Sequence, residues 1–226
     1  MILEDAARKI GRYNDLALHY DLVASQIYLR RSDGGADPFG ESFLPYIIAG
    51  LICFDMERMM GRGLAEKYRP ECRGFAWRLS RKLQVIRPLL GPLVNHDITE
   101  VDLQQQRGAI CEAYETLSDG GKGALHEQRK SFHVGATKIL HFLNPKLFTI
   151  VDSNAARAFR HAPHNVPFRA ATQPGYSADL YMRCMSCAQG DIRTYGLDRF
   201  QALEPGVPIM GLYDKLTFVT GSDRRQ

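Results

Sequence analysis

The stretch from Ser131 to Arg160 constrains the fold more than any other part of the chain. Apolar residues between Thr137 and Leu143 recur at helical spacing, and Asn144-Pro145 ends this pattern because a residue before proline avoids the α-helical region. The small residues from Val134 to Thr137 predict a tight turn before the helix. A helix N-terminus has unpaired amides and a partial positive charge, so Gly135, Ala136 and Thr137 could receive a phosphate.

A second helix is predicted to begin near Asp152. The apolar run from Leu147 to Val151 is followed by Asp152-Ser153-Asn154, three residues that often cap helices, and then by the helix-forming run from Ala155 to Phe159. The aspartate is therefore expected at the start of a helix. On the local pattern alone, its role is that of an N-cap.

These residues carry a resemblance to a known family. A turn with a glycine, a lysine-bearing helix, a loop and then the sequence from Val151 to Arg157 resemble the helix-hairpin-helix DNA glycosylase superfamily. The chain departs from the family pattern at His133, where a glycine is usual. It departs again at Thr137, where bifunctional members usually have the lysine, because Lys138 follows one residue later. The segment from Lys138 to Asp152 is also shorter than in most members.

The resemblance implies an all-α fold in which two helical lobes flank a DNA-binding cleft, and an enzyme that excises a damaged or modified base. The target nucleotide would leave the base stack, and Asp152 would stabilise positive charge on the sugar or activate water. Lys138 could attack the sugar and cleave the strand, or it could face a phosphate in a monofunctional enzyme. Base excision repair and defence against modified viral DNA are both compatible with this activity. The expected DNA contacts are His133, Gly135, Ala136, Thr137, Asn154 and Arg157.

The remainder of the chain is also predicted to be helical. No convincing alternation of apolar and polar residues is present, and the one β-like run, 148–151, stands alone. Residues up to about 118 would form lobe one, residues 118–123 a linker, and residues from about 122 to 226 the hairpin and catalytic lobe of a single domain. The predicted helices outside the central stretch cover residues 3–31 as one or two helices, 41–60, 73–90, 100–117, 177–188, 191–203 and 208–219.

The predicted helix 73–90 is basic on one side. It carries five cations with no acid among them, and this face could be a solvated surface or could follow a phosphate backbone. The helix also contains Trp77, the single tryptophan, which is predicted to pack in the core rather than to stack on a base. Candidates for a base pocket are Phe39, Tyr46 and Trp77. The cations are Arg73, Arg78, Arg81, Lys82 and Arg87, and the residues expected to pack are Phe75, Trp77, Leu79, Leu83, Val85 and Ile86.

Composition limits the cofactors and the compartment. The five cysteines are odd in number and scattered, which argues against a disulfide framework and favours a reducing compartment. Cys184 and Cys187 form a single CxxC pair, and His161 and His164 lie in a proline-containing loop, so no metal and no cofactor are predicted. The net charge of +4 permits binding to double-stranded DNA. We expect an intracellular, nucleoid-associated monomer in the cytoplasm, without a membrane span.

Two other functions stay open at this point. A non-catalytic DNA-binding module could keep the hairpin and use Asp152 only as a cap. A metal-dependent phosphohydrolase of the HD type could use His96, Asp97 and further histidines, although no complete set stands in helical register. Otherwise, Asp97 or Thr99 would cap the helix predicted to begin at Glu100.

Overall fold

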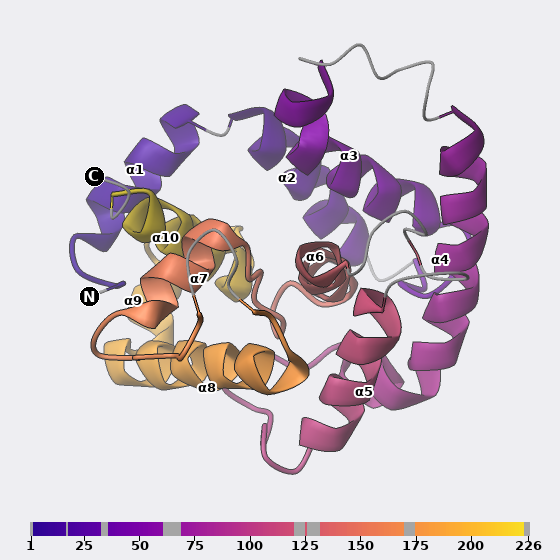
Figure 1. Cartoon of the computed structure of the whole chain (residues 1–226). Helices are drawn as coiled ribbons and strands as arrows, with labels where there is room; N and C mark the ends of the chain where they lie inside the picture. Colours follow the sequence, from indigo (N-terminus) through magenta and orange to yellow (C-terminus); the bar gives the residue numbers. More distant parts are fainter. Residues whose placement is uncertain are drawn as a thin grey trace.

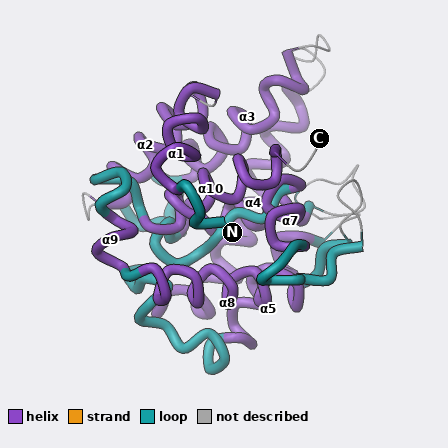
Figure 2. The backbone as a smooth tube through the Cα atoms, turned by 90° about the vertical axis from the view of Figure 1, so that its left-hand side faces the viewer, coloured by secondary structure: helices purple, strands orange, loops and turns teal. Residues whose placement is uncertain are grey.

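The computed structural model describes residues 2–16, 18–32, 36–60, 69–119, 125, 132–169 and 175–223. Within these ranges the chain forms ten α-helices, one short 3-10 helix and no strand, so the predicted all-α class is confirmed (Figures 1 and 2). The elements are α1 (Ala6–Leu16), α2 (Leu18–Ser32), α3 (Leu44–Met60), α4 (Arg69–Leu90), η1 (Gly91–Leu93), α5 (Arg107–Ser118), α6 (His133–Leu143), α7 (Ser153–Arg160), α8 (Ala178–Tyr195), α9 (Leu197–Gln201) and α10 (Ile209–Asp223).

Helix α6 lies in the middle of the molecule, with the other helices around it (Figure 1). It packs on α5 and α3, while α4 packs on α5 and α3, and α2 on α3. On the other side of α6, α10 packs on α7 and on α1, so the first helix of the chain completes the C-terminal group. The segment between α6 and α7 therefore connects the two groups of helices.

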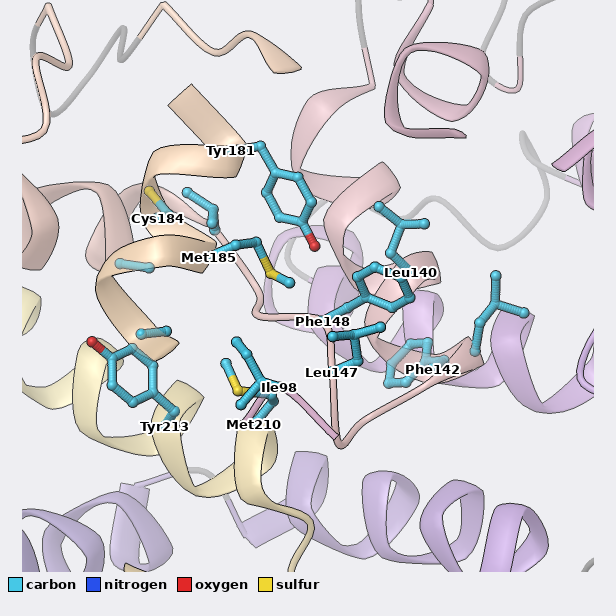
Figure 3. Packing of buried hydrophobic residues seen from close by; sticks show 14 of the residues in the cluster. Ile98, Leu140, Phe142, Leu147, Phe148, Tyr181, Cys184, Met185, Met210 and Tyr213 are labelled. Carbon is cyan, nitrogen blue, oxygen red and sulfur yellow. The ribbon is translucent and has the colours of Figure 1, made fainter. Parts of the chain in front are cut away.

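The core of the described residues is one continuous cluster of buried apolar side chains. Near α6 it includes Leu140 and Phe142, the loop residue Phe148, Met185 of α8 and Tyr213 of α10, all of them fully buried (Figure 3). Burial of one such side chain contributes about 1.5–3 kcal/mol to folding. The buried side chain of Phe148 thus fixes the middle of the loop between α6 and α7, and this loop leads directly to the start of α7.

A buried lysine joins α1, α2 and α10. The Nζ atom of Lys215 lies 2.9 Å from Asp21 and 2.9 Å from Glu204, and it donates a 2.8 Å hydrogen bond to Asn14. Its ammonium group also lies 5.5 Å from the ring centre of Tyr13. A buried cation needs such partners to offset its lost hydration, so this cluster fixes the first two helices against α10.

Several predicted helix boundaries were wrong, and three of them have a local cause. The last part of the chain was expected to break between 188 and 191, but α8 continues to Tyr195 and ends at Gly196, whose φ of 93° suits glycine. Helix α5 begins at Arg107 and not at Glu100, because residues 98–106 form successive turns. Asp97 closes the first of these turns by accepting hydrogen bonds from the amide and the hydroxyl of Thr99. Helix α6 begins at His133, so the turn expected at Val134 to Thr137 is helical.

Helix α4 also differs from its predicted packing. Trp77 was expected in the core, but 61% of its surface is exposed, and Val85 is exposed as well. Among the cations, Lys82 pairs with Asp119 at 2.9 Å, and Arg87 pairs with Asp37 at 2.6 Å. Two of the five cations of this face are therefore paired with carboxylates of the protein itself. The periodicity correctly placed Leu79, Leu83 and Ile86 in the core, because they lie three or four residues apart on one side of the helix.

None of the helices in the described ranges is both long enough and apolar enough to cross a membrane. The linker predicted at residues 118–123 lies outside the described residues from Gly120 onwards, as do residues 126–131 before α6.

Candidate active site around Asp152

Asp152 is the N-cap of α7, as the sequence predicted. Its backbone is extended, with φ −94° and ψ −170°, and its Oδ1 atom accepts hydrogen bonds from the amides of Asn154 at 2.8 Å and Ala155 at 2.9 Å. The other oxygen, Oδ2, receives no hydrogen bond from the residues that the structure describes. The side chain is half-buried, and its Oδ1 atom anchors the carboxylate at the start of α7.

A second carboxyl group lies near Asp152. Asp214 of α10 is 6% exposed, and burial raises its pKa well above the usual range for a carboxyl group. The negative charge of Asp152 raises this pKa further, whereas the positive charge of Lys138 lowers it. The two carboxyl groups therefore differ in environment, since Asp152 is held by helix amides and Asp214 is desolvated.

Lys138 lies on α6 with only 8% of its surface exposed. The sequence placed it near Asp152 as a candidate nucleophile. In the structure, the positive charge of Lys138 opposes the upward shift of the Asp214 pKa, so α6 and α10 bring these two side chains near each other.

Aromatic side chains lie beside the aspartate. Tyr176 is half-buried, and burial followed by the charge of Asp152 raises the pKa of its hydroxyl. Its ring centre lies 5.8 Å from that of His133, in the first turn of α6. His133 in turn stacks on Tyr114, with 3.1 Å between Nδ1 and the phenol oxygen, and burial lowers the pKa of its imidazole. Sequence reasoning missed Tyr176, because it precedes α8 in a segment without periodicity.

The residues predicted to form a phosphate-binding turn are buried inside α6. The Ala136 amide donates to the Phe132 carbonyl at 2.8 Å, and Thr137 Oγ1 accepts from the Val151 amide at 3.2 Å. Gly135 is covered by the ring of Phe132, which lies 2.1 Å from where a Cβ would stand. The glycine permits this close ring contact, and the helix starts earlier than predicted. Binding of a phosphate by these amides stays a prediction.

Asn154 and Arg157 join α7 to α10. The Nη1 atom of Arg157 donates to Asn154 Oδ1 at 2.6 Å and to the Gly221 carbonyl at 3.0 Å. Both residues were predicted to contact DNA. Their observed bonds are structural, and their DNA contacts stay predictions.

The three base-pocket candidates lie in different surroundings, and a base pocket among them stays a prediction. Phe39 is buried in the core, where its carbonyl accepts a 2.9 Å bond from Gln84 of α4, and Tyr46 stacks on Phe43 with 5.9 Å between ring centres. Trp77 is on α4, on the opposite side of α6 from α7 (Figure 1). The charge of Asp152 acts on Tyr176, and His133 lies 5.8 Å from Tyr176 between ring centres.

The residues of the alternative HD site serve local structure. His96 lies 3.5 Å from Glu100, both exposed, and Asp97 is bound to Thr99. Over the described ranges, no group of three or more histidine, cysteine, aspartate or glutamate side chains is arranged to hold a metal ion.

Comparison with known proteins adds no assignment. No protein-family model matches the chain, and neither the curated proteins nor the solved structures contain a match to it. Any function is therefore inferred from the arrangement of the side chains around Asp152.

Proposed function

We propose that the protein is a DNA glycosylase that excises a modified or damaged base. The observation that carries this proposal is the state of Asp152, whose Oδ1 atom is fixed by two helix amides while Oδ2 accepts no bond from the described residues. A carboxylate fixed in this way can stabilise developing positive charge without reorganising during the reaction. Cleavage of an N-glycosidic bond generates such a charge on the sugar.

The aromatic residues next to Asp152 suit an extruded base. A flipped nucleotide is usually held by stacking and by hydrogen bonds to its edge. In this proposal Tyr176 and His133 supply the stacking surface, and the Tyr176 hydroxyl and the Nε2 atom of His133 bind the polar edge of the base. Asp152 then lies on the side of the sugar. Water attacks at C1′ as the base leaves, with Oδ2 of Asp152 orienting it or stabilising the charged sugar.

Lys138 favours the monofunctional form of this reaction. A lysine nucleophile must reach the sugar and must be neutral when it attacks. Lys138 is almost fully buried on α6, and its positive charge opposes the upward shift of the Asp214 pKa. We therefore propose that Lys138 remains a charged, buried group near Asp214 and that the strand is not cleaved by a lysine Schiff base.

DNA recognition belongs to the same proposal. The net charge of +4 favours a polyanion, and the two groups of helices on either side of α6 would lie along the duplex as the two lobes of a cleft. His133, Asn154 and Arg157, with the first turn of α6, are the proposed contacts on the catalytic side. We propose a monomer acting on cytoplasmic, nucleoid DNA, in repair or in defence against modified viral DNA.

The proposal is tested by incubating the protein with genomic DNAs of different modification status and by scoring abasic sites through alkali-induced nicking. Asp152→Asn should lose activity by at least about a hundredfold while keeping its fold, because asparagine also caps helices. The matched control is Asp102→Asn. Asp102 Oδ1 accepts bonds from the amides of Gln104 and Gln105 at 2.9 and 3.1 Å, so it has the same capping geometry at an exposed turn.

Abasic sites made by the wild type and by Asp102→Asn, but not by Asp152→Asn, would support the glycosylase. Nicking without alkali would contradict the proposed role of Lys138. DNA that is bound but left intact by all three proteins would overturn the glycosylase in favour of a non-catalytic DNA-binding module.

A further inference from the structure

Helix α4 carries a stripe of exposed side chains on its outer side. Four exposed residues follow one another at intervals of three or four, which places them along one side of the helix. They are Trp77, Arg81, Val85 and Pro88. The helix itself packs on α3 and α5, and it lies on the opposite side of α6 from α7 (Figure 1). This α4 stripe is therefore separate from the candidate site at Asp152.

The tryptophan of the α4 stripe is paired with a cation. The guanidinium carbon of Arg81 lies 5.0 Å from the ring centre of Trp77, which is within the range of a cation–π interaction. With Arg81 in this position, 61% of the Trp77 surface is still exposed. Trp77 therefore offers an open aromatic surface with a positive charge beside it. Proteins that bind single-stranded nucleic acids combine aromatic side chains, on which the bases stack, with cations for the phosphates.

The charge of α4 favours an anionic partner. Residues 73–90 contain five cations and no acid. Two carboxylates from elsewhere in the chain, Asp37 and Asp119, pair with cations of this helix. Neither these two nor any other carboxylate of the described residues forms an ion pair with Arg81. The charge of Arg81 thus stands beside the open aromatic ring, where a phosphate group complements it.

A second copy of the chain and a membrane surface complement the α4 stripe less well. In a two-fold dimer the same surface meets itself, so the cations of α4 would face each other. Attachment to a membrane surface requires a broad apolar face. Here Arg81 separates Trp77 from Val85, and the continuous apolar side of α4 is buried in the core. The partner that fits is a polyanion with open aromatic faces, which is a nucleic acid with unpaired bases.

We propose that the α4 stripe is a docking surface for single-stranded DNA, in which an unpaired base stacks on Trp77 and the adjoining phosphate binds Arg81. Val85 lies about 12 Å further along the helix and gives the next part of the strand an apolar contact. Double-stranded DNA does not fit, because its bases are already stacked inside the duplex. The choice of DNA over RNA rests on the proposed function at Asp152, whereas the docking of a single strand does not.

The test uses the fluorescence of Trp77, which is the single tryptophan and therefore reports only from this surface. The full-length protein is titrated at low salt with an oligothymidylate of about ten nucleotides. Stacking of a base on the indole ring should quench the emission. Heparin is the matched polyanion without bases, and at saturation it should quench the emission much less.

Affinity is measured in parallel by the anisotropy of a labelled oligothymidylate. Trp77→Ala should weaken binding about tenfold, because one stacked base is lost. Arg81→Gln should also weaken binding, and it should reduce the slope of log K against log salt by about 0.7, because one phosphate contact is lost. The matched control is Arg199→Gln. Arg199 lies 4.5 Å from the ring centre of Tyr195, in α9 and far from α4 (Figure 1), so this variant removes a similar cation and should keep both affinity and slope.

Unchanged emission of the wild type at saturating oligothymidylate would overturn the proposal. Tighter binding of oligouridylate would assign the surface to RNA, and a blue shift that grows with protein concentration, together with a dimer in ultracentrifugation, would assign it to a second copy. Each of these results would also overturn it. Asp152→Asn should be quenched like the wild type. Base excision without quenching would overturn only the α4 surface, and quenching without base excision would overturn only the glycosylase.

Discussion

Gly221 of α10 lies directly against the backbone of Asn154 in α7. A Cβ atom on Gly221 would stand 1.9 Å from the Asn154 carbonyl oxygen and 2.8 Å from its Cα. The Gly221 carbonyl also accepts the 3.0 Å hydrogen bond from Arg157. Because the Asn154 amide donates to Asp152, this backbone contact between two helices determines where the candidate catalytic carboxylate stands.

We expect Gly221→Ala to destabilise the protein by about 3 kcal/mol, since the added methyl group meets backbone atoms that cannot rotate away. Urea unfolding would measure this change. Gly190→Ala is the matched control, because Gly190 is an exposed helical glycine where an added Cβ would have no atom within 4 Å, and alanine there should stabilise α8 by about 0.5–1 kcal/mol. Equal unfolding midpoints for Gly221→Ala and the wild type would show that α7 and α10 can separate freely.

The sequence allowed prediction of those elements whose signal is local. The apolar spacing in residues 3–31 and 41–60 predicted α1 to α3, and the run Asp152-Ser153-Asn154 predicted the start of α7. Positions decided by side-chain packing were predicted less well. Gly135 suggested a turn, yet it serves to admit the ring of Phe132, and Trp77 lies on the outer side of α4 although its residue type favours burial.

Of the residues at the candidate site, the sequence allowed prediction of only one carboxylate, Asp152. Asp152 is recognisable because its neighbours in sequence form its cap. Asp214 and Tyr176 lie far from it along the chain, and only the folding of α10 and of the segment before α8 brings them close. His164 was noted only together with His161, since its 3.0 Å approach to Asp191 of α8 depends on the loop after α7.

His141 makes stability depend on pH. It is fully buried, with Nε2 2.8 Å from the Tyr28 hydroxyl and Nδ1 2.8 Å from the Phe148 carbonyl, and burial lowers its pKa to about 4 although the bond to Phe148 opposes the shift. In the unfolded chain a histidine has a pKa near 6.5. As the pH falls from about 6.5 to 4, His141 becomes protonated in the unfolded state but stays neutral in the folded state. We expect His141 to cost about 1.4 kcal/mol of stability per pH unit in this window, about 3 kcal/mol in total.

This expectation is measured by urea unfolding of the wild type and His141→Gln at pH 7, 6 and 5. Glutamine will lower stability at pH 7 by about 1–3 kcal/mol, because one of the two buried hydrogen bonds is disturbed. The difference between the two proteins should then shrink as the pH falls. A difference that stays constant from pH 7 to pH 5 would mean that His141 does not titrate in the unfolding equilibrium.

Trp77 reports its own exposure. It is the single tryptophan, 61% exposed, and the guanidinium carbon of Arg81 lies 5.0 Å from its ring centre. We expect the native protein to fluoresce at nearly the wavelength of the urea-unfolded chain and to be quenched by acrylamide almost as strongly. Trp77→Phe should change stability by about 0.5 kcal/mol or less. A strongly blue-shifted native emission would instead place this side chain in an apolar environment, as its residue type first suggested.

Asp214→Asn separates the roles of the two carboxyl groups near Lys138. Burial raises the pKa of Asp214, so the stability of the wild type should decline as the pH rises above about 4 and through this raised pKa, where the buried group must ionise. Asparagine has nearly the same shape and cannot ionise. The variant should therefore gain stability relative to the wild type as the pH increases from 5 to 9, measured by thermal unfolding, whereas the exposed Asp179→Asn should show no such trend.

If the charged carboxylate in base excision is Asp152, Asp214→Asn should also retain base excision within about tenfold of the wild type, while Asp152→Asn loses it. Loss of excision in a stable Asp214→Asn protein would assign the catalytic proton transfer to Asp214 and leave Asp152 as the cap of α7.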